Sequence, residues 1–318
     1  MKQEMAKTIY LVIPCYNEEE ALPVTATVLE KIINGLKEKG KISEGSSVLF
    51  VNDGSKDNTW NIICELNAKN PMFKGINLSR NKGHQNALLA GLMAARDYAD
   101  AVISMDADLQ DDVGAIERFI DCFREGNDIV YGVRSSREKD TFFKKYTAES
   151  FYKIMRALGV DIVFNHADYR LMSKRALEAL AEYDEVNLFL RGIIPEIGFN
   201  SAVVEYERNE RVAGESKYPL KKMISFALDG ITSFSIKPIR MVFNCGIMFF
   251  LISAIAAVWA IIEKSMGNTV PGWSSLMVSI WFVGGAVLLG LGIVGEYIGK
   301  IYSEVKRRPR YIIKDKLL

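Results

Sequence analysis

The stretch that decides the fold is AVISMDADLQ, residues 101–110. An apolar run ends there in two carboxylates that stand two positions apart. Because residues i and i+2 of an extended segment project to the same side, the pattern predicts that Asp106 and Asp108 face one hard cation. Gln110 supplies a further oxygen, and such a cation keeps coordination positions open for phosphate. The alternative is that the two acids only cap the helix that follows.

Strand and helix patterns alternate around this stretch and predict an α/β domain. The expected strands are 9–13, 48–51, 73–78, the one ending at Asp106, and 129–133. The expected helices are 18–38, one starting near residue 57, and 84–98. Short apolar runs separated by helices are typical of a mostly parallel sheet that is buried on both faces.

Polar residues follow each of the first four expected strands. These clusters are PCYNE at 14–18, NDGS at 52–55, SRNKG at 79–83 and DADLQ at 106–110. In open α/β sheets, ligands bind beyond the carboxyl ends of the strands. The four clusters therefore predict one binding site along a single rim of the sheet.

Two runs without any charged residue, 241–262 and 276–295, set the C-terminal part apart. A bilayer is crossed by about 20 apolar residues, so we expect a transmembrane hairpin of helices at 241–262 and 273–297. The alternative is a pair of buried helices in a soluble core. Basic residues flank the pair, which predicts a multi-pass protein with both termini in the cytoplasm. They are Lys237, Arg240, Lys300, Lys306, Arg307, Arg308 and Arg310.

The remaining domain boundaries follow from these two parts. Residues 1–211 form the expected cytoplasmic domain, 212–240 a loop with interfacial amphipathic helices, and 298–318 a basic cytoplasmic tail. A helix at 220–236 lies on the membrane surface or packs on the core as an ordinary helix. The motif GLGIVG at 290–295 lies inside an apolar run, so we interpret it as a helix-packing surface compatible with a homo-oligomer. A net charge of +1 argues against a nucleic-acid partner.

Several motifs together resemble a known family. The segments IPCYNE at 13–18, VNDGS at 51–55 and DAD at 106–108 resemble the inverting glycosyltransferases of family 2, which have the A-type nucleotide-sugar-binding fold. Later segments resemble the polyprenyl-phosphate glycosyltransferases, a group with dolichyl-phosphate mannose synthase, bacterial glucosyl-carrier enzymes and aminoarabinose-carrier enzymes. Those segments are DYRL at 168–171, GESKY at 214–218, GEYIGKIY at 295–302 and RPRY at 308–311.

The resemblance implies a metal-dependent donor site. Asp106, Asp108 and Gln110 would hold Mg²⁺ or Mn²⁺, which neutralises the charge of a departing nucleoside diphosphate. Asp106 would also contact the nucleotide sugar. The further residues that would do so are Pro14, Tyr16, Glu18, Asp53, Arg80 and Lys82. UDP is preferred through resemblance to the bacterial carrier enzymes. The alternative for Asp53-Gly54 and for 81–83 is an ordinary turn.

The acceptor implied by the resemblance is a lipid monophosphate. The second pKa of a phosphate monoester is about 6, so the lipid phosphate is largely dianionic at neutral pH. A strong general base is therefore unnecessary. Asp168, expected beside Asp108 in the catalytic centre, orients the reacting groups or accepts a residual proton. Cationic side chains should hold the phosphate, and the candidates are Arg134, Arg137, Arg170 and Lys217.

The expected function is the inverting transfer of a single sugar, glucose or a related hexose, from a UDP-sugar to an undecaprenyl-type polyprenyl phosphate. It would take place at the cytoplasmic face of the cell inner membrane, with the lipid bilayer as a partner. A processive polysaccharide synthase is the first alternative, although the chain lacks the Q-x-x-R-W motif of that group. A non-catalytic membrane scaffold is the second, although the acidic pair is intact.

Overall fold

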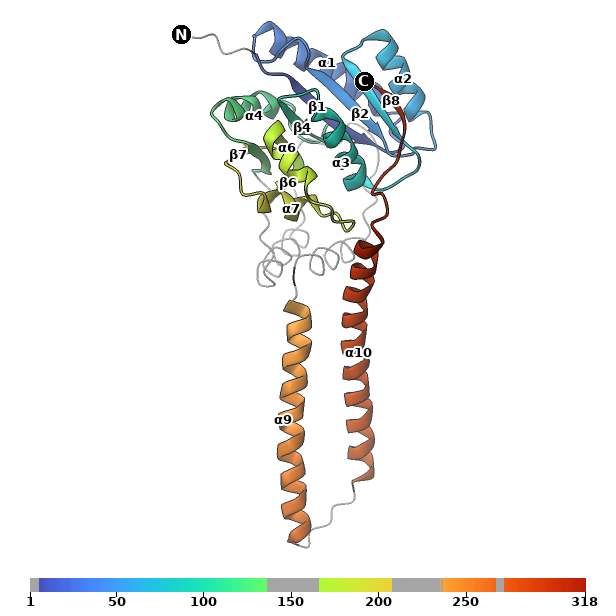
Figure 1. Ribbon diagram of the computed structural model, residues 1–318, viewed down its shortest axis with the longest axis vertical. Coiled ribbons are helices and arrows are strands. Elements are labelled where there is room, and N and C mark those ends of the chain that lie inside the picture. The colour runs from blue at the N-terminus through green and yellow to red at the C-terminus, as the bar shows by residue number, and fades with distance from the viewer. Residues whose placement is uncertain (1–5, 136–165, 208–234, 236, 267–271) are drawn as a thin grey trace. The chain divides into compact units, whose positions relative to one another are not determined.

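The structure is a computed structural model that describes residues 6–135, 166–207, 235, 237–266 and 272–318 (Figure 1). The chain divides into two units. The first contains Met1–Tyr152, Asp161–Pro219 and Arg308–Leu318. The second contains Lys153–Val160 and Leu220–Arg307.

A mixed, mostly parallel sheet of eight strands forms the centre of the first unit, in the order β7-β5-β6-β4-β1-β2-β3-β8. Its strands are β1 (Ile9–Cys15), β2 (Ser47–Asn52), β3 (Phe73–Leu78), β4 (Ala101–Ser104), β5 (Ile129–Arg134), β6 (His166–Ser173), β7 (Ser201–Tyr206) and β8 (Ile313–Leu317). β1 is parallel to both of its neighbours, β2 and β4. β6 and β8 are antiparallel to the strands beside them. The predicted α/β class is confirmed.

Helices cover both faces of this sheet, because its central strands are apolar on both sides. They are α1 (Leu22–Glu38), α2 (Thr59–Lys69), α3 (His84–Ala95), α4 (Ala115–Arg124), α6 (Lys174–Ala181) and α7 (Leu190–Glu196). Alternate residues of β1, such as Ile9 and Leu11, pack in one core with buried residues of α1 and α4. Val12 faces the other side and meets α3 at Gly91.

The C-terminal residues complete the sheet. Residues 298–318 were expected to be a basic tail, whereas β8 pairs antiparallel with β3 from Gly75↔Leu317 to Leu78↔Ile313. The sequence IKDKL places three consecutive charged residues between two apolar ones, a pattern that does not indicate a strand against the basic residues around it. β8 thereby occupies the edge of the sheet next to the third strand of the predicted site.

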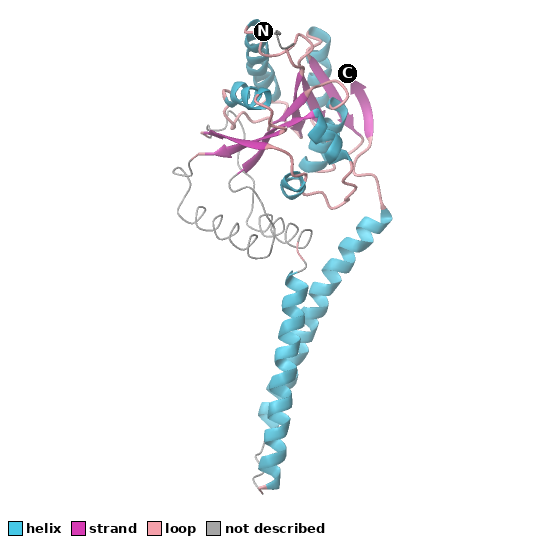
Figure 2. Ribbon diagram, turned by 60° about the vertical axis from the view of Figure 1, so that its left-hand side comes forward, coloured by secondary structure: helices cyan, strands magenta, loops and turns pink. Residues whose placement is uncertain are grey.

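The second unit contains two long helices, α9 (Lys237–Ser265) and α10 (Trp273–Lys306). They lie side by side (Figures 1 and 2), with the rings of Phe249 and Phe282 centred 5.7 Å apart. Gly290 of the GLGIVG motif faces α9, where an added Cβ would lie 3.2 Å from Val242 Cγ1. Within the described residues one stretch, Ser279–Lys306, is long and apolar enough to cross a membrane. The interfacial helix expected at 220–236 falls almost entirely outside the described residues.

A pair of glycine substitutions tests the packing of α3 on the sheet. A Cβ at Gly91 would lie 2.4 Å from Val12 Cγ1 and 2.7 Å from Val51 Cγ2, and both valines are stiff and buried in central strands. Gly91→Ala should therefore lower stability by about 1–3 kcal/mol. Gly35→Ala in α1, where nothing lies within 4 Å, should raise it by up to about 1 kcal/mol through helix propensity. Thermal unfolding in detergent shows whether each variant is more or less stable than the wild type. A change of stability in the same direction for both variants would contradict this packing.

Candidate active site

Three parallel strands end side by side at the predicted rim. The register pairs Cys15 with Asn52 and Val12 with Ser104, so the residues that follow β1, β2 and β4 emerge at the same edge of the sheet. Pro14 is buried within β1, whereas Tyr16 beyond its end is 43% exposed. The structure thus brings the first, second and fourth polar clusters together.

Asp53 fastens the loop after β3 to the end of β2. Its carboxylate accepts the backbone N–H groups of Lys82 at 2.7 Å and Gly83 at 2.9 Å. Gly54 has φ 62°, and a Cβ there would lie 2.5 Å from the backbone carbon of Arg80, so only glycine fits. Burial raises the pKa of Asp53, although the two N–H groups oppose the shift. Asp53 therefore organises the turn at 81–83 as well as lying in the predicted donor site.

Asp106 and Asp108 do not stand on an extended strand, so that part of the prediction is wrong. β4 ends at Ser104, and Asp108 lies in a turn where its Oδ1 accepts the Gln110 N–H at 3.2 Å. Leu109 has φ 52°, which turns the chain away from the strand direction. The short aspartate side chain competes with the strand ladder by bonding the backbone two residues on.

The capping alternative for these two acids is also wrong. The residue at the N-cap of α4 is Gly114, and no side chain caps that helix. Asp112 accepts the Gly114 N–H at 2.8 Å, so it organises the turn before the helix. Asp106 and Asp108 lie earlier, at the rim.

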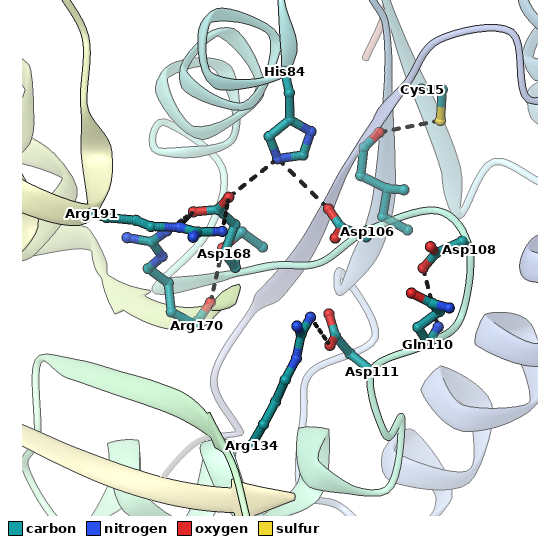
Figure 3. A network of polar contacts seen from close by, with 12 residues as sticks. Cys15, His84, Asp106, Asp108, Gln110, Asp111, Arg134, Asp168, Arg170 and Arg191 are labelled. Carbon is teal, nitrogen blue, oxygen red and sulfur yellow. Dashed lines mark hydrogen bonds and ion pairs between the residues drawn. The ribbon is translucent and has the colours of Figure 1, made fainter. Parts of the chain in front are cut away.

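His84, the first residue of α3, lies between two aspartates. Its Nε2 is 3.6 Å from Asp106 Oδ1 and 3.6 Å from Asp168 Oδ2 (Figure 3). The Asp168 carboxylate also accepts Nε of Arg191 at 3.2 Å and Nη2 at 3.1 Å, one on each oxygen. Nη2 of Arg170 donates to the same carboxylate. We call Asp168 with Arg170 and Arg191 the aspartate clamp.

The pKa values of the two aspartates beside His84 are shifted in opposite directions. Burial disfavours ionisation of Asp168, but Arg191, His84 and Arg170 outweigh it and hold the pKa well below the ordinary value. Burial raises the pKa of Asp106; His84 opposes this shift, whereas the nearby carboxylates add to it. For His84, burial lowers the pKa, but Asp168 and Asp106 raise it further, so the net shift is upward. Asp168 is thus a fixed anion, and Asp106 lies where a positive charge is favoured.

The predicted acceptor cations occupy different environments. Arg170 is 1% exposed. Its Nη2 donates to Asp168, whereas its Nε and Nη1 have no partner within the described structure. The side chain of Arg134 is 29% exposed, and its Nη2 is 3.4 Å from Asp111 Oδ1. Tyr206 donates its O–H to that same Asp111 oxygen at 2.6 Å. The two other candidates, Arg137 and Lys217, lie outside the described residues.

The remaining donor candidates lie around the rim. Glu18 is half-buried, with its N–H donating to Thr59 Oγ1 at 3.0 Å. Arg80 is exposed. Lys82 is half-buried and its Nζ donates to the carbonyl of Pro309 at 3.3 Å.

Sequence reasoning missed Arg191 and missed the position of His84 between the two aspartates. Arg191 is the single charge in the apolar run LFLRGII, 188–194, and that isolation was the available signal, because a charge in an apolar segment needs a partner. His84 follows directly on the SRNKG cluster, and only the fold shows that the first turn of α3 reaches Asp168.

The chemistry of the rim fits a hard divalent cation that is completed by ligand oxygens. No group of three or more His, Cys, Asp and Glu forms a ready metal cage within the described residues. Magnesium, however, commonly binds one or two carboxylates together with substrate phosphates. Asp106 and Asp108 supply hard oxygen donors, and the raised pKa of Asp106 among neighbouring carboxylates favours a cation there.

Comparison with known proteins gives two family matches. Residues 10–181 match Glycosyl transferase family 2, and residues 237–301 match the GtrB C-terminal hairpin. The chain is 54% identical to the uncharacterized glycosyltransferase YkoT of Bacillus subtilis (strain 168), over 98% of this chain and 93% of that one. It is 44% identical to a bactoprenol glucosyl transferase of Shigella phage SfII, over 96% and 97%.

The chain also aligns with a solved structure. The mannosyltransferase PcManGT from Pyrobaculum calidifontis, in complex with GDP-Man and Mn²⁺, aligns at a TM-score of 0.43 and 15% identity, over 94% of this chain and 85% of that one. The hairpin match and the apolar stretch Ser279–Lys306 together indicate membrane association.

The aspartate clamp should contribute stability that depends on pH. Because the folded-state pKa of Asp168 is depressed, its contribution is present above the ordinary aspartate pKa of about 3.9 and is lost as pH falls through the folded value. Arg191→Met should therefore cost about 1–2 kcal/mol at pH 7, discounted for partial exposure, and less at lower pH.

The matched control is Arg175→Met, which removes an arginine that is 64% exposed and paired with Asp128 at 2.7 Å. That change should cost less than about 1 kcal/mol. Thermal unfolding at pH 7 and at roughly pH 3, below the ordinary aspartate pKa, measures both variants. Equal losses for the two variants, or an Arg191→Met loss that grows toward acid, would contradict the clamp.

Proposed function

This chain belongs to glycosyltransferase family 2, and on that premise we propose that it transfers one sugar, with inversion, from a UDP-sugar to a polyprenyl phosphate. The observation that carries the proposal is the convergence of Asp53, Asp106 and Asp108 with the aspartate clamp at one rim of the sheet. Relatives 43–44% identical over nearly the whole chain are named bactoprenol glucosyl transferases, which supports glucose and a polyprenyl phosphate.

The donor would lie across the ends of β1, β2 and β4. Tyr16, exposed beside β1, offers an aromatic face to the base, and Asp53 lies where a base or ribose would meet the end of β2. Arg80 and Lys82 flank this position from the loop after β3. Asp106 and Asp108, with Gln110, would hold Mg²⁺ or Mn²⁺. That cation supplies charge neutralisation for the departing diphosphate.

The acceptor phosphate would approach from the side of the aspartate clamp. A lipid monophosphate is largely dianionic at neutral pH, since its second pKa is about 6, and it needs no strong base. Asp168, whose pKa is held well below the ordinary range, is a poor proton acceptor. We therefore assign it to positioning: it keeps Arg191 and His84 aimed at the rim, where their positive charges face the two anionic substrates.

Membrane anchoring brings the catalytic unit to its lipid. We propose that α9 and α10 cross the cytoplasmic membrane as a hairpin, with the catalytic unit and both termini on the cytoplasmic side. Large apolar side chains along both helices are exposed, as lipid-facing positions require. The basic residues that flank the helices support this orientation. The polyprenyl tail stays in the bilayer, and its phosphate is presented at the membrane surface.

A donor panel tests the proposal and identifies the sugar. Membranes containing the protein are incubated with undecaprenyl phosphate, Mn²⁺ and one labelled nucleotide sugar at a time, and the lipid fraction is extracted. We expect label from UDP-glucose or a related UDP-hexose as a single residue on the lipid. Label in a polymer would instead indicate a processive synthase, and no transfer from any donor would indicate a scaffold.

Removing one carboxylate at the rim should abolish transfer. Asp108→Ala deletes an oxygen donor for the cation, so we expect turnover to fall by at least about 10²–10³-fold, the loss that follows removal of a transition-state charge stabiliser. The folded state should persist, because Asp108 is partly exposed. The matched control, Asp97→Ala, removes an aspartate that is 66% exposed. Near-normal turnover of Asp108→Ala in the donor assay would overturn the assignment.

Metal removal gives an independent check. Chelation by EDTA should abolish both transfer and UDP binding, and added Mn²⁺ or Mg²⁺ should restore them, since the crowded carboxylates at the rim disfavour a diphosphate without a cation. Titration calorimetry with UDP measures the binding. Metal-independent binding and transfer would show that the acidic pair has another role.

A further inference from the structure

A chain of side-chain hydrogen bonds runs from the C-terminal strand to the donor rim. Asp315 on β8 accepts from Nδ2 of Asn77 at 2.8 Å, and Oδ1 of Asn77 accepts from Nδ2 of Asn52 at 2.8 Å. Oδ1 of Asn52 then accepts the backbone N–H of Ser55 at 3.3 Å. Asn52 and Asn77 are 2% and 7% exposed, so water cannot easily replace these bonds.

The chain continues from the loop after β2 to the loop after β1. Oγ of Ser55 accepts the N–H of Asn17 at 3.0 Å, and Oδ1 of Asn17 accepts the N–H of Lys56 at 2.9 Å. Asn17 has φ 55°, a left-handed conformation that the polar contacts of asparagine help to hold. The two loops that line the donor rim are therefore tied to each other and to β8.

The same C-terminal segment also holds the loop after β3. Its Ile312 carbonyl accepts the N–H of Ser79 at 2.9 Å, and its Pro309 carbonyl accepts from Nζ of Lys82 at 3.3 Å. The Lys82 N–H in turn donates to Asp53. The C-terminal segment is thus linked by hydrogen bonds, directly or through Asn77 and Asn52, to three of the four polar clusters that make up the site.

The Asp315 carboxylate stands at one end of this series of hydrogen bonds and sets which group of each amide donates and which accepts. An amide group can be turned over with little change of shape, so Asn77 and Asn52 could each present either oxygen or nitrogen to a neighbour. A carboxylate only accepts, so Asp315 requires the NH₂ of Asn77. The oxygen of Asn77 must then face Asn52, and the oxygen of Asn52 must face Ser55.

We propose that Asp315 is a positioning residue for the nucleotide-sugar donor. By fixing both amides, it holds the Ser55 loop and, through that loop, Asn17 in the conformation that receives the nucleotide. The inference rests on the proposed function, because it assumes that a nucleotide sugar binds at this rim. Loss of the Asp315 charge should raise the donor KM and the Kd for UDP, while the kcat of the bound complex stays nearly unchanged.

The test first breaks this series of hydrogen bonds and then restores it. Asn77→Asp puts a carboxylate against Asp315 and removes the donor between them, so both donor-side loops should loosen. In N77D/D315N, the new carboxylate accepts from Asn52 and from the new amide, so every bond of the chain is restored with the charge moved by one position. Asp315→Ala is a second single variant at an exposed position. Lys316→Ala, exposed on the same strand, is the matched control.

We expect N77D to raise the donor KM and the Kd for UDP with Mn²⁺ about tenfold, which corresponds to about 1.4 kcal/mol, with kcat within about twofold. D315A should show a smaller rise, while K316A and N77D/D315N should resemble the wild type. Hydrogen exchange at Ser55 and Asn17 should rise and recover in parallel, without any nucleotide present.

Two results would overturn the inference. The first is an unchanged KM and unchanged exchange in both single variants, although the wild type binds UDP. The second is a loss in N77D that D315N does not rescue, which would mark a merely structural role. Failure of the wild type to bind UDP would instead contradict the proposed function, and the exchange measurement would still decide whether Asp315 orders the loops.

Discussion

The parallel pairing of β1 with β2 on one side and β4 on the other is the constraint on which the site depends. Parallel neighbours end at the same edge, so the residues after these strands have to share one rim. The close approach of α3 to Val12 and Val51 at Gly91 fixes the helix that crosses this part of the sheet. Because α3 begins at His84, that packing also sets where the histidine meets the two aspartates.

The rim separates its carboxylates into two electrostatic classes. Asp168 lies against two guanidinium groups and stays ionised, whereas Asp106 lies among other acids with the His84 imidazole beside it. Groups whose environments push their pKa values apart commonly have different roles in one site. In this protein the first class suits positioning, and the second suits a cation bound together with a diphosphate. His84 lies 3.6 Å from a carboxylate of each class, and in the proposed function it would link the donor side to the acceptor side.

Local pattern was sufficient for the elements and for the rim. The run at 73–78 predicted β3 with its observed bounds, because a short apolar segment between turns has few other solutions. Asp53 and Asp106 were found because polar residues after buried strands are a local signal. The turn at Asp108 was missed: β4 ends at Ser104, and the Asp108 side chain then accepts the Gln110 N–H in a turn that the apolar pattern does not indicate.

Contacts between distant residues could not be read from the pattern. Arg191 meets Asp168 across 23 positions, and Asn77 meets Asp315 across 238. Neither pairing has a periodicity or a spacing motif. β8 shows the same limit, because IKDKL, with three charged residues in a row, becomes a strand only where the exposed edge of β3 provides hydrogen-bonding partners.

We propose that Asp106 and Asp108 hold the cation that binds the donor diphosphate. Anomalous scattering from crystals grown with UDP and Mn²⁺ tests it most directly. We expect one manganese peak at coordination distance, about 2.0–2.2 Å, from carboxylate oxygens of this pair and from phosphate oxygens of UDP, as for other small octahedral cations. A manganese peak elsewhere, or UDP bound at the rim without metal, would contradict it.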